Sequence, residues 1–207
     1  AAMVESVDDC ACRVMEILEK HGIADRTAII FTSDNGGLLG PTNNAPLRSG
    51  KGYAYEGGIR VPLIMKWPGV VKGGTTSSEP VTSVDFLPTI AEAARLDLPK
   101  GVEIDGTSLV DHLLSGGKKS LAREAIYWHF PHYRHNPGPY SIIREGSWKL
   151  IKFYEGPMEL FNLTDDLGEK KNLASAMPDK VKELDTRLLA HLQSIGAKMP
   201  KPNSEKK

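Results

Sequence analysis

The sequence predicts an α/β protein, made of part of a mixed, mostly parallel sheet with flanking helices, followed by a small antiparallel sheet with one helix. Residues 27–32 are rich in β-forming apolar residues, which is typical of a strand buried on both faces of a mostly parallel sheet. An apolar stripe at helical spacing comes before them, so that helix, loop and strand form one αβ unit. From about residue 119, short apolar runs separated by turns indicate antiparallel strands. We therefore predict two domains, residues 1–118 and residues 119–207.

The first of these domains is predicted to hold helices and strands on both sides of one long loop. Its first helix ends at Gly22, since basic residues followed by glycine are typical of a helix C-terminus. Residues 33–60 are dense in Gly, Asn, Pro and Ser, and long loops of this kind inside compact domains are usually functional. A second strand is predicted at residues 61–67, a helix at 84–94 and a short helix at 109–114.

The second domain is predicted to be a small antiparallel sheet covered by one helix. Glu145-Gly146 is typical of a hairpin turn, and residues 179–194 carry apolar residues at helical spacing. The four predicted strands are residues 124–130, 140–144, 148–153 and 159–162.

The charge balance argues against nucleic acid or an anionic membrane as a partner. The 26 Lys and Arg residues equal the 26 Asp and Glu residues in number, which gives no reason to expect a basic surface. The longest apolar run, residues 28–31, is far shorter than the roughly 20 residues of a membrane span. Cys10 and Cys12 are the only cysteines in the sequence, which excludes a disulfide framework.

Residues 33–37 (SDNGG) directly follow the first predicted strand. In open α/β sheets, ligands bind at the carboxyl ends of the strands. The carboxylate of Asp34 and the amide oxygen of Asn35 are hard donors of the kind that Ca²⁺ or Mg²⁺ prefers. The alternative is a simple turn, because Asn-Gly is a common turn dipeptide. Two residues are too few for Ca²⁺, which takes about 6–8 oxygens, so further groups must complete such a site.

Lys51 stands between two glycines in the same loop. The segment is not a P-loop, because that motif requires glycine where Ala45 stands and Ser or Thr where Gly52 stands. A lysine flanked by glycines can still deliver a point charge to an anion along a closely approaching backbone. The alternative is a solvated surface lysine.

Taken together and in this order, these motifs resemble the arylsulfatase-type sulfatases of the alkaline-phosphatase superfamily. The resemblance extends over nearly the whole chain. The matching segments are residues 33–36 (SDNG), 44–48 (NAPLR), 50–52 (GKG), 56–62 (EGGIRVP), 67–69 (WPG), 85–89 (DFLPT), 105–109 (DGTSL), 148–151 (WKLI), 159–163 (ELFNL) and 169–174 (EKKNLA).

The resemblance implies roles for three residues of the long loop. Asp34 and Asn35 match the later two of the protein ligands to a divalent cation, usually Ca²⁺, and Lys51 matches the lysine that contacts the substrate's sulfate group. The implied reaction is hydrolysis of a sulfate ester, in which a formylglycine hydrate attacks sulfur. The implied substrate is a sulfated small molecule or a sulfated glycan, and the implied location is the periplasm, the lysosome or the cell exterior.

The sequence departs from the family pattern at the nucleophile. Sulfatases carry the nucleophile in a Cys-x-Pro-Ser-Arg or Ser-x-Ala-x-Arg segment, and residues 10–13 (CACR) do not match it. The first metal ligands of the family are also without counterparts. We therefore expect the chain to correspond to the C-terminal half of a sulfatase, to contain no catalytic nucleophile, to hold an incomplete Ca²⁺ site and to be inactive alone.

A cluster of histidines and aromatic residues, 129–135 (HFPHYRH), is the last candidate. Three histidines at a spacing of three are compatible with a zinc site, but Pro131 breaks a helix, so they need not share a face. Contact between His132 and a sulfated sugar is the better functional interpretation, and a partly exposed aromatic loop without such a role is the alternative.

Two other functions stay open on the sequence alone. One is a phosphodiesterase or phosphomutase of the same superfamily, whose sites usually hold two metals with His and Asp ligands; the segment 56–62 argues against it. The other is a non-catalytic protein that binds sulfate or glycans, which the missing nucleophile favours.

Overall fold

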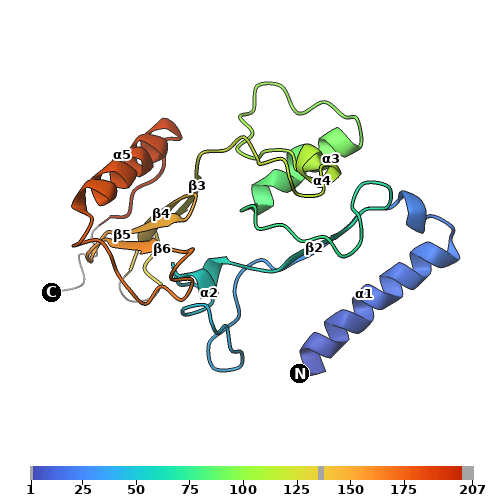
Figure 1. The fold of residues 1–207 in the computed structure, drawn as a ribbon, viewed down its shortest axis with the longest axis horizontal. Helices are drawn as coiled ribbons and strands as arrows, with labels where there is room; N and C mark the ends of the chain where they lie inside the picture. Colours follow the sequence, from blue (N-terminus) through green and yellow to red (C-terminus); the bar gives the residue numbers. More distant parts are fainter. Residues whose placement is uncertain (1, 135–137, 202–207) are drawn as a thin grey trace. The chain divides into compact units, whose positions relative to one another are not determined.

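The computed structural model describes residues 2–134 and 138–201, which divide into two compact units (Figure 1). One unit comprises the chain up to Thr32 together with Leu63–Ala122, and the other comprises Ser33–Pro62 together with the chain from Arg123 onward. The sequence analysis assigns residues 33–60 to the first of two domains. In the structure this loop is part of the same unit as the C-terminal sheet.

The first unit contains a two-stranded sheet and several helices. Strands β1 and β2 pair antiparallel, with Ile29 opposite Lys66 and Thr32 opposite Leu63. The elements of this unit are α1 (Ala2–Lys20), the 3₁₀ helix η1 (Ala24–Arg26), β1 (Ile29–Thr32), β2 (Leu63–Lys66), the 3₁₀ helix η2 (Ser83–Asp85), α3 (Phe86–Ala93) and α4 (Val110–Leu114).

The environment of β1 differs from the prediction for residues 27–32. That segment is predicted to be buried on both faces of a mostly parallel sheet, but β1 is shorter, pairs antiparallel with β2, and leaves Phe31 40% exposed. Ile64 on β2 is 62% exposed. The physical reason is that a two-stranded ladder does not cover its own faces. None of the residues of the neighbouring helix in the sequence, α1, is buried either.

Asp85 organises the helical part of the first unit. One of its carboxylate oxygens accepts a hydrogen bond from the backbone N–H of Thr82 at 2.8 Å, and the other accepts from Thr107 N–H at 2.9 Å. Thr89 donates to the Asp85 carbonyl and accepts from Leu109 N–H. A buried carboxylate with backbone donors at both oxygens is fully satisfied, so Asp85 is a structural residue that joins the segments 82–89 and 107–109.

The second unit is built on a four-stranded antiparallel meander in the order β3-β4-β5-β6. The predicted turn at Glu145-Gly146 joins β4 and β5, with Glu145 opposite Trp148. The elements are α2 (Glu56–Ile59), β3 (Ile126–Phe130), β4 (Tyr140–Glu145), β5 (Trp148–Phe153), β6 (Glu159–Asn162) and α5 (Pro178–Ser194). The antiparallel sheet and its helix are confirmed, whereas the short helix α2 inside the long loop is not predicted.

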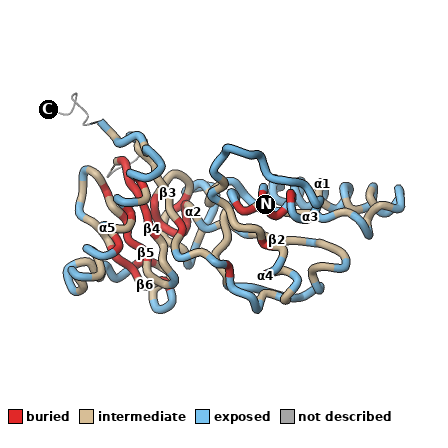
Figure 2. The backbone as a smooth tube through the Cα atoms, turned by 90° about the horizontal axis from the view of Figure 1, so that it is seen from above, coloured by how far each residue is buried: buried red, intermediate tan, exposed pale blue. Residues whose placement is uncertain are grey.

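Both faces of this sheet are covered, and its strands carry many of the residues that the backbone tube marks as buried in red (Figure 2). Alternate residues of a strand point to opposite faces. On one face Ile143, Leu150 and Leu160 pack against three leucines of α5, which are Leu184, Leu188 and Leu192. On the other face Ile142, Ile151 and Phe161 pack against Ala54 and Tyr55 of the long loop. The loop is therefore one of the two layers that cover the sheet.

Helix α5 has clear sequence signals at both ends. Pro178 occupies its first turn, where a missing N–H costs nothing. Gly196 adopts φ 60°, and the bonds Ala197 N–H to Leu192 carbonyl and Gly196 N–H to Gln193 carbonyl complete a Schellman motif. In the part of the chain that the structure describes, no helix combines the length and the apolar character that a membrane span requires.

Candidate functional site

The long loop is held together by hydrogen bonds between its own backbone groups. Gly36 donates its N–H to the carbonyl of Gly58 at 3.0 Å, and Lys51 donates its N–H to the carbonyl of Gly37 at 3.0 Å. The segment that carries Asp34 is thereby bound to two later segments of the loop. The sequence places no helix or strand there, and these bonds take the place of a regular ladder.

Glycine is required where the loop segments cross. A Cβ atom on Gly36 would lie 1.7 Å from the carbonyl oxygen of Gly57, and one on Gly57 would lie 2.3 Å from that of Ser49. A Cβ on Gly58 would lie 2.2 Å from the carbonyl oxygen of Tyr53. Any side chain would therefore force backbone apart, which explains the glycines of residues 36 and 57–58 by close packing of main chain on main chain.

Asn44 fixes the loop from within. Its amide oxygen accepts from Gly37 N–H at 3.1 Å, and its amide nitrogen donates to the carbonyls of Gly37 and Ser49 at 2.9 and 3.0 Å. Ser49 adopts φ 60°, a left-handed conformation that few non-glycine residues take. The side chain of Asn44 thus acts as a bridge that sets the start and the end of the segment preceding Lys51.

The structure brings Asp34, Asn35 and Lys51 into one part of the loop. The carbonyl that receives the Lys51 N–H belongs to the second residue after Asn35. Asp34 is exposed, and Asn35 and Lys51 are partly buried. Ser33 donates its hydroxyl to the Asn35 carbonyl at 2.9 Å, and the backbone bends at residues 34 and 35. The roles in binding cation and sulfate stay predictions.

His132 is in the segment that follows β3, and no bond links it to Asp34, Asn35 or Lys51 among the contacts described above. Its ring is exposed and packs edge-on against Phe130, with the ring centroids 5.1 Å apart. His129 instead points one ring nitrogen at the Ser141 hydroxyl and the other at the Lys198 carbonyl. Both ring nitrogens of His129 are engaged in these two bonds, and His135 lies outside the described residues.

The chemistry of the donors at Asp34 and Asn35 fits a hard divalent cation, but the set is small. Among residues 2–134 and 138–201, no group of three or more His, Cys, Asp or Glu side chains converges as metal ligands would. A carboxylate and an amide give two or three oxygens of the roughly 6–8 that Ca²⁺ takes. The two residues therefore fit part of a cation site.

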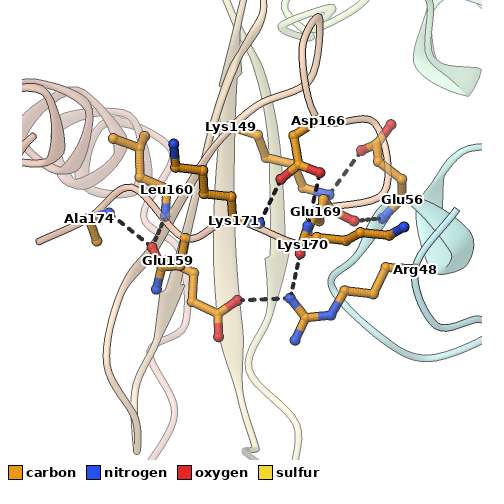
Figure 3. A network of polar contacts seen from close by, with 11 residues as sticks. Arg48, Glu56, Lys149, Glu159, Leu160, Asp166, Glu169, Lys170, Lys171 and Ala174 are labelled. Carbon is orange, nitrogen blue, oxygen red and sulfur yellow. Dashed lines mark hydrogen bonds and ion pairs between the residues drawn. The ribbon is translucent and has the colours of Figure 1, made fainter. Parts of the chain in front are cut away.

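A buried cluster of charges lies behind the loop, which we call the ionic triad: Glu56, Lys149 and Glu169 (Figure 3). Lys149 Nζ on β5 lies 2.9 Å from Glu56 Oε1 on α2 and 2.7 Å from Glu169 Oε1. The second oxygen of Glu169 accepts the backbone N–H of Glu56 at 2.6 Å. Glu56 Oε2 accepts no hydrogen bond from the described residues and lies 3.7 Å from Arg60 Nη1.

The turn that presents Glu169 is itself tightly bonded. Asp166 accepts the backbone N–H groups of Lys170 and Lys171 at 3.0 and 2.8 Å, and these two bonds lower the pKa of its carboxyl group. Glu169 sits at φ 51°. Burial raises the pKa of Glu169, and the charge of Lys149 opposes that shift. The turn therefore holds a carboxylate in a position from which water is excluded.

Arg48 connects the loop to the same turn. Its Nη1 donates to the carbonyl of Glu169 at 2.9 Å and lies 3.6 Å from Glu159 Oε2 (Figure 3). Its guanidinium also stacks 3.7 Å above the centre of the Tyr55 ring. Burial, together with the negative charge of Glu159, raises the pKa of Tyr55 to about 12. Arg48 thus holds the loop against β6 and the turn at once.

The ionic triad is absent from the sequence analysis. Its members are separated by 93 residues between Glu56 and Lys149 and by 20 between Lys149 and Glu169, so no local pattern links them. A usable signal exists nonetheless. Each member lies in a segment that carries the family resemblance, and each is a charged residue next to apolar or glycine residues that the pattern would bury.

Comparison with known proteins agrees with this picture. Residues 49–198 match the family model described as N-sulphoglucosamine sulphohydrolase, C-terminal, and residues 1–96 match the model described as sulfatase. A sulfatase of Formosa agariphila is 40% identical over 205 residues, covering 87% of this chain and 36% of the relative.

Two solved structures are similar at the level of the fold. The structure of Ps i-CgsB in complex with k-i-k-neocarrahexaose has a TM-score of 0.82 and 32% identity, and covers 91% of this chain and 41% of that chain. The structure of BT4656 in complex with its substrate D-glucosamine-2-N,6-O-disulfate has a TM-score of 0.78 and 32% identity. The match covers 99% of this chain and 41% of that chain. This chain spans about two fifths of the length of these relatives.

The chain belongs to the sulfatase family, a family of hydrolases within the alkaline phosphatase-like superfamily. Within it, the matched models and structures place the chain in the C-terminal region, and the α/β class predicted from the sequence is confirmed. Sulfatases generally use a divalent metal.

Proposed function

We propose that this chain supplies part of a sulfatase active site, in which Asp34 and Asn35 bind a divalent cation and Lys51 binds a sulfate oxygen. The observation that carries the proposal is the 3.0 Å bond from Lys51 N–H to the carbonyl of Gly37. It fixes the lysine backbone beside the segment that holds both oxygen donors, and a charged lysine near hard oxygen ligands is the composition of an oxyanion site.

Each residue has a distinct task in this proposal. The Asp34 carboxylate and the Asn35 amide oxygen hold the cation, with Ca²⁺ as the expected ion. When bound, the cation polarises the sulfate group and offsets its negative charge. The Lys51 ammonium faces the remaining sulfuryl oxygens, where negative charge grows as the ester bond breaks. The nucleophile is expected outside this chain.

The proposed substrate class is a sulfated sugar. Two similar proteins have been solved with sulfated saccharides, a carrageenan oligosaccharide and a glucosamine disulfate. In this chain the exposed ring of His132, seated against Phe130, offers a hydrogen-bonding and stacking surface that suits a sugar. We assign His132 to substrate contact on that basis.

The test uses a full-length sulfatase that contains this sequence. Lys51→Ala is expected to lower kcat/KM for an aryl sulfate by roughly 10²–10³-fold, the effect of losing one preorganised oxyanion donor. Lys51→Arg should restore only part of the rate, because a planar guanidinium does not occupy the place of an ammonium. Lys182→Ala, on the exposed side of α5, is the matched control and should leave the rate unchanged.

Three results would change the proposal. Wild-type kcat/KM in Lys51→Ala would remove Lys51 from the site. Faster turnover of an aryl phosphate than of the aryl sulfate would favour phosphate ester chemistry. Binding of a sulfated oligosaccharide with no turnover in the full-length protein would favour a non-catalytic binding protein.

A further inference from the structure

The ionic triad is costly to bury, which raises the question of what it does. Lys149 and Glu169 have side chains that are 0% exposed, and Glu56 is 2% exposed. Removing charges from water is penalised strongly, and buried ion pairs are often no more stabilising than apolar residues of the same volume. What such a cluster does provide is a fixed geometry, because charge-assisted hydrogen bonds hold their donor and acceptor groups at defined relative positions.

Lys149 is a rigid anchor for that arrangement. The two residues that follow it, Leu150 and Ile151, are fully buried on opposite faces of the sheet. Its backbone is also paired on both sides, opposite Arg144 on β4 and Phe161 on β6. The backbone that carries the Lys149 side chain is therefore fixed by pairing on both sides within the buried part of the sheet.

The triad reaches the candidate site through Glu56. Glu169 accepts the N–H of Glu56 at the first residue of α2, and Lys149 binds the Glu56 side chain. The two residues that follow are Gly57, which donates to the Arg48 carbonyl at 2.8 Å, and Gly58, whose carbonyl accepts the N–H of Gly36. Gly36 is the residue after Asn35. The path from the anchor to the cation segment therefore consists of consecutive residues and direct hydrogen bonds.

We propose that Lys149 and Glu169 are positioning residues for the long loop of residues 33–60, which we call the site loop. They act through Glu56 to set where Asp34, Asn35 and Lys51 lie. Which ligand the loop receives rests on the proposed function. The positioning itself does not, because it concerns bonds within this chain.

Glu169→Gln is the most informative variant. The wild-type carboxylate accepts at both oxygens, from Lys149 Nζ and from Glu56 N–H. An amide has only one oxygen, so its NH₂ group must face one of these two donors. The variant leaves Lys149 and Glu56 as a balanced pair of charges and is therefore expected to fold. Glu169→Asp keeps the charge, shortens the reach and serves as the second variant.

Amide hydrogen exchange of this chain, resolved by residue, is the measurement. In both variants we expect the amides of Gly36, Lys51, Gly57 and Gly58 to exchange about 10-fold faster or more, relative to amides of β4 and β5. The reason is that one of the charge-assisted hydrogen bonds of Glu169, which hold this part of the loop through Glu56, is lost. Asp185→Asn is the matched control. It removes the charge that pairs with Lys152 between α5 and β5 at 2.7 Å, and it should not affect the loop selectively.

The outcomes separate cleanly. If amide exchange rates rise equally over the loop and the sheet, the triad only stabilises the unit as a whole. If the exchange rates of the loop amides do not change, the triad does not hold the loop. Either result overturns the proposal. The same variants in a full-length sulfatase containing this sequence should lower kcat for an aryl sulfate. If wild type shows no such turnover while the loop-selective exchange is present, the proposed function fails and the positioning role stands.

Discussion

Replacement of Gly36 by alanine tests the packing of the site loop most directly. A Cβ at this position would lie 1.7 Å from the carbonyl oxygen of Gly57, whereas real Cβ atoms essentially never come within 3.0 Å of another heavy atom. The two backbone segments must therefore separate by the difference, about 1.3 Å. That movement takes the Gly36 N–H out of hydrogen-bonding range of Gly58, which it now reaches at 3.0 Å.

The expected loss follows from those two effects. Forcing an atom into a packed region costs about 1–3 kcal/mol, and losing a backbone hydrogen bond costs about 1 kcal/mol. We therefore expect Gly36→Ala to lower the free energy of unfolding of the second unit by about 2–4 kcal/mol. The Lys51 amide should lose protection against exchange in the same variant.

Urea unfolding followed by tryptophan fluorescence measures this loss. A Trp67→Phe background removes the tryptophan of the first unit, so that Trp128 and Trp148 report on the second. Lys182→Ala, at an exposed position of α5 in the second unit, is the control; it should change stability by less than about 0.5 kcal/mol. A Gly36→Ala protein as stable as the control would refute the close packing of these segments.

Three further predictions concern the sheet, the tyrosine under Arg48 and the isolated chain. Leu188→Ala, at the centre of the α5 contact, should destabilise the second unit by about 2–5 kcal/mol, whereas Leu189→Ala on the same helix, 40% exposed, should have a much smaller effect; equal losses in urea unfolding would contradict the packing of α5. Because the pKa of Tyr55 is raised from its ordinary 10.0 to about 12 in the folded chain, the folded state keeps a proton that the unfolded state loses. The contribution of Tyr55 to the free energy of unfolding is therefore present below pH 10.0 and is lost as pH rises to about 12. Tyr55→Phe should flatten stability over that range, and an unchanged pH profile would show that Tyr55 is not the group responsible. The chain alone should hydrolyse no chromogenic aryl sulfate and bind Ca²⁺ weakly, because Asp34 and Asn35 supply few of the roughly 6–8 oxygens required; sub-micromolar affinity in calorimetry, or metal-dependent turnover, would contradict this.

Local sequence patterns were sufficient to predict the strands of the C-terminal sheet and the helix that covers it. Residues 140–144 and 148–153 are short, largely apolar runs on either side of a Glu-Gly turn, and the antiparallel strands β4 and β5 form there. Helix α5 begins within one residue of the predicted start, because the apolar residues at helical spacing that predict it all lie within the helix. Such elements follow from sequence because their determinants lie within a few residues of one another.

Long-range packing was not predictable in the same way. The apolar residues of 27–32 correctly indicate a strand, yet apolarity alone does not state what covers it, and Phe31 is 40% exposed in this structure. Similarly, the glycines of the loop indicate a turn-rich segment but not that it forms a layer on the C-terminal sheet. The buried position of Lys149 runs against the usual exposure of lysine, and only its two carboxylate partners, both distant in sequence, explain it.

The order of synthesis gives the ionic triad a consequence for how the site loop forms. Glu56 leaves the ribosome 113 residues before Glu169 and 93 before Lys149. At typical elongation rates of about 5–20 residues per second, the segment carrying Asp34, Asn35 and Lys51 waits on the order of 10 s for the residues that hold it. During that interval its glycine-rich backbone has no sheet to cover. The site loop is therefore among the last parts of the second unit to become ordered, although it is the first part of that unit to be made.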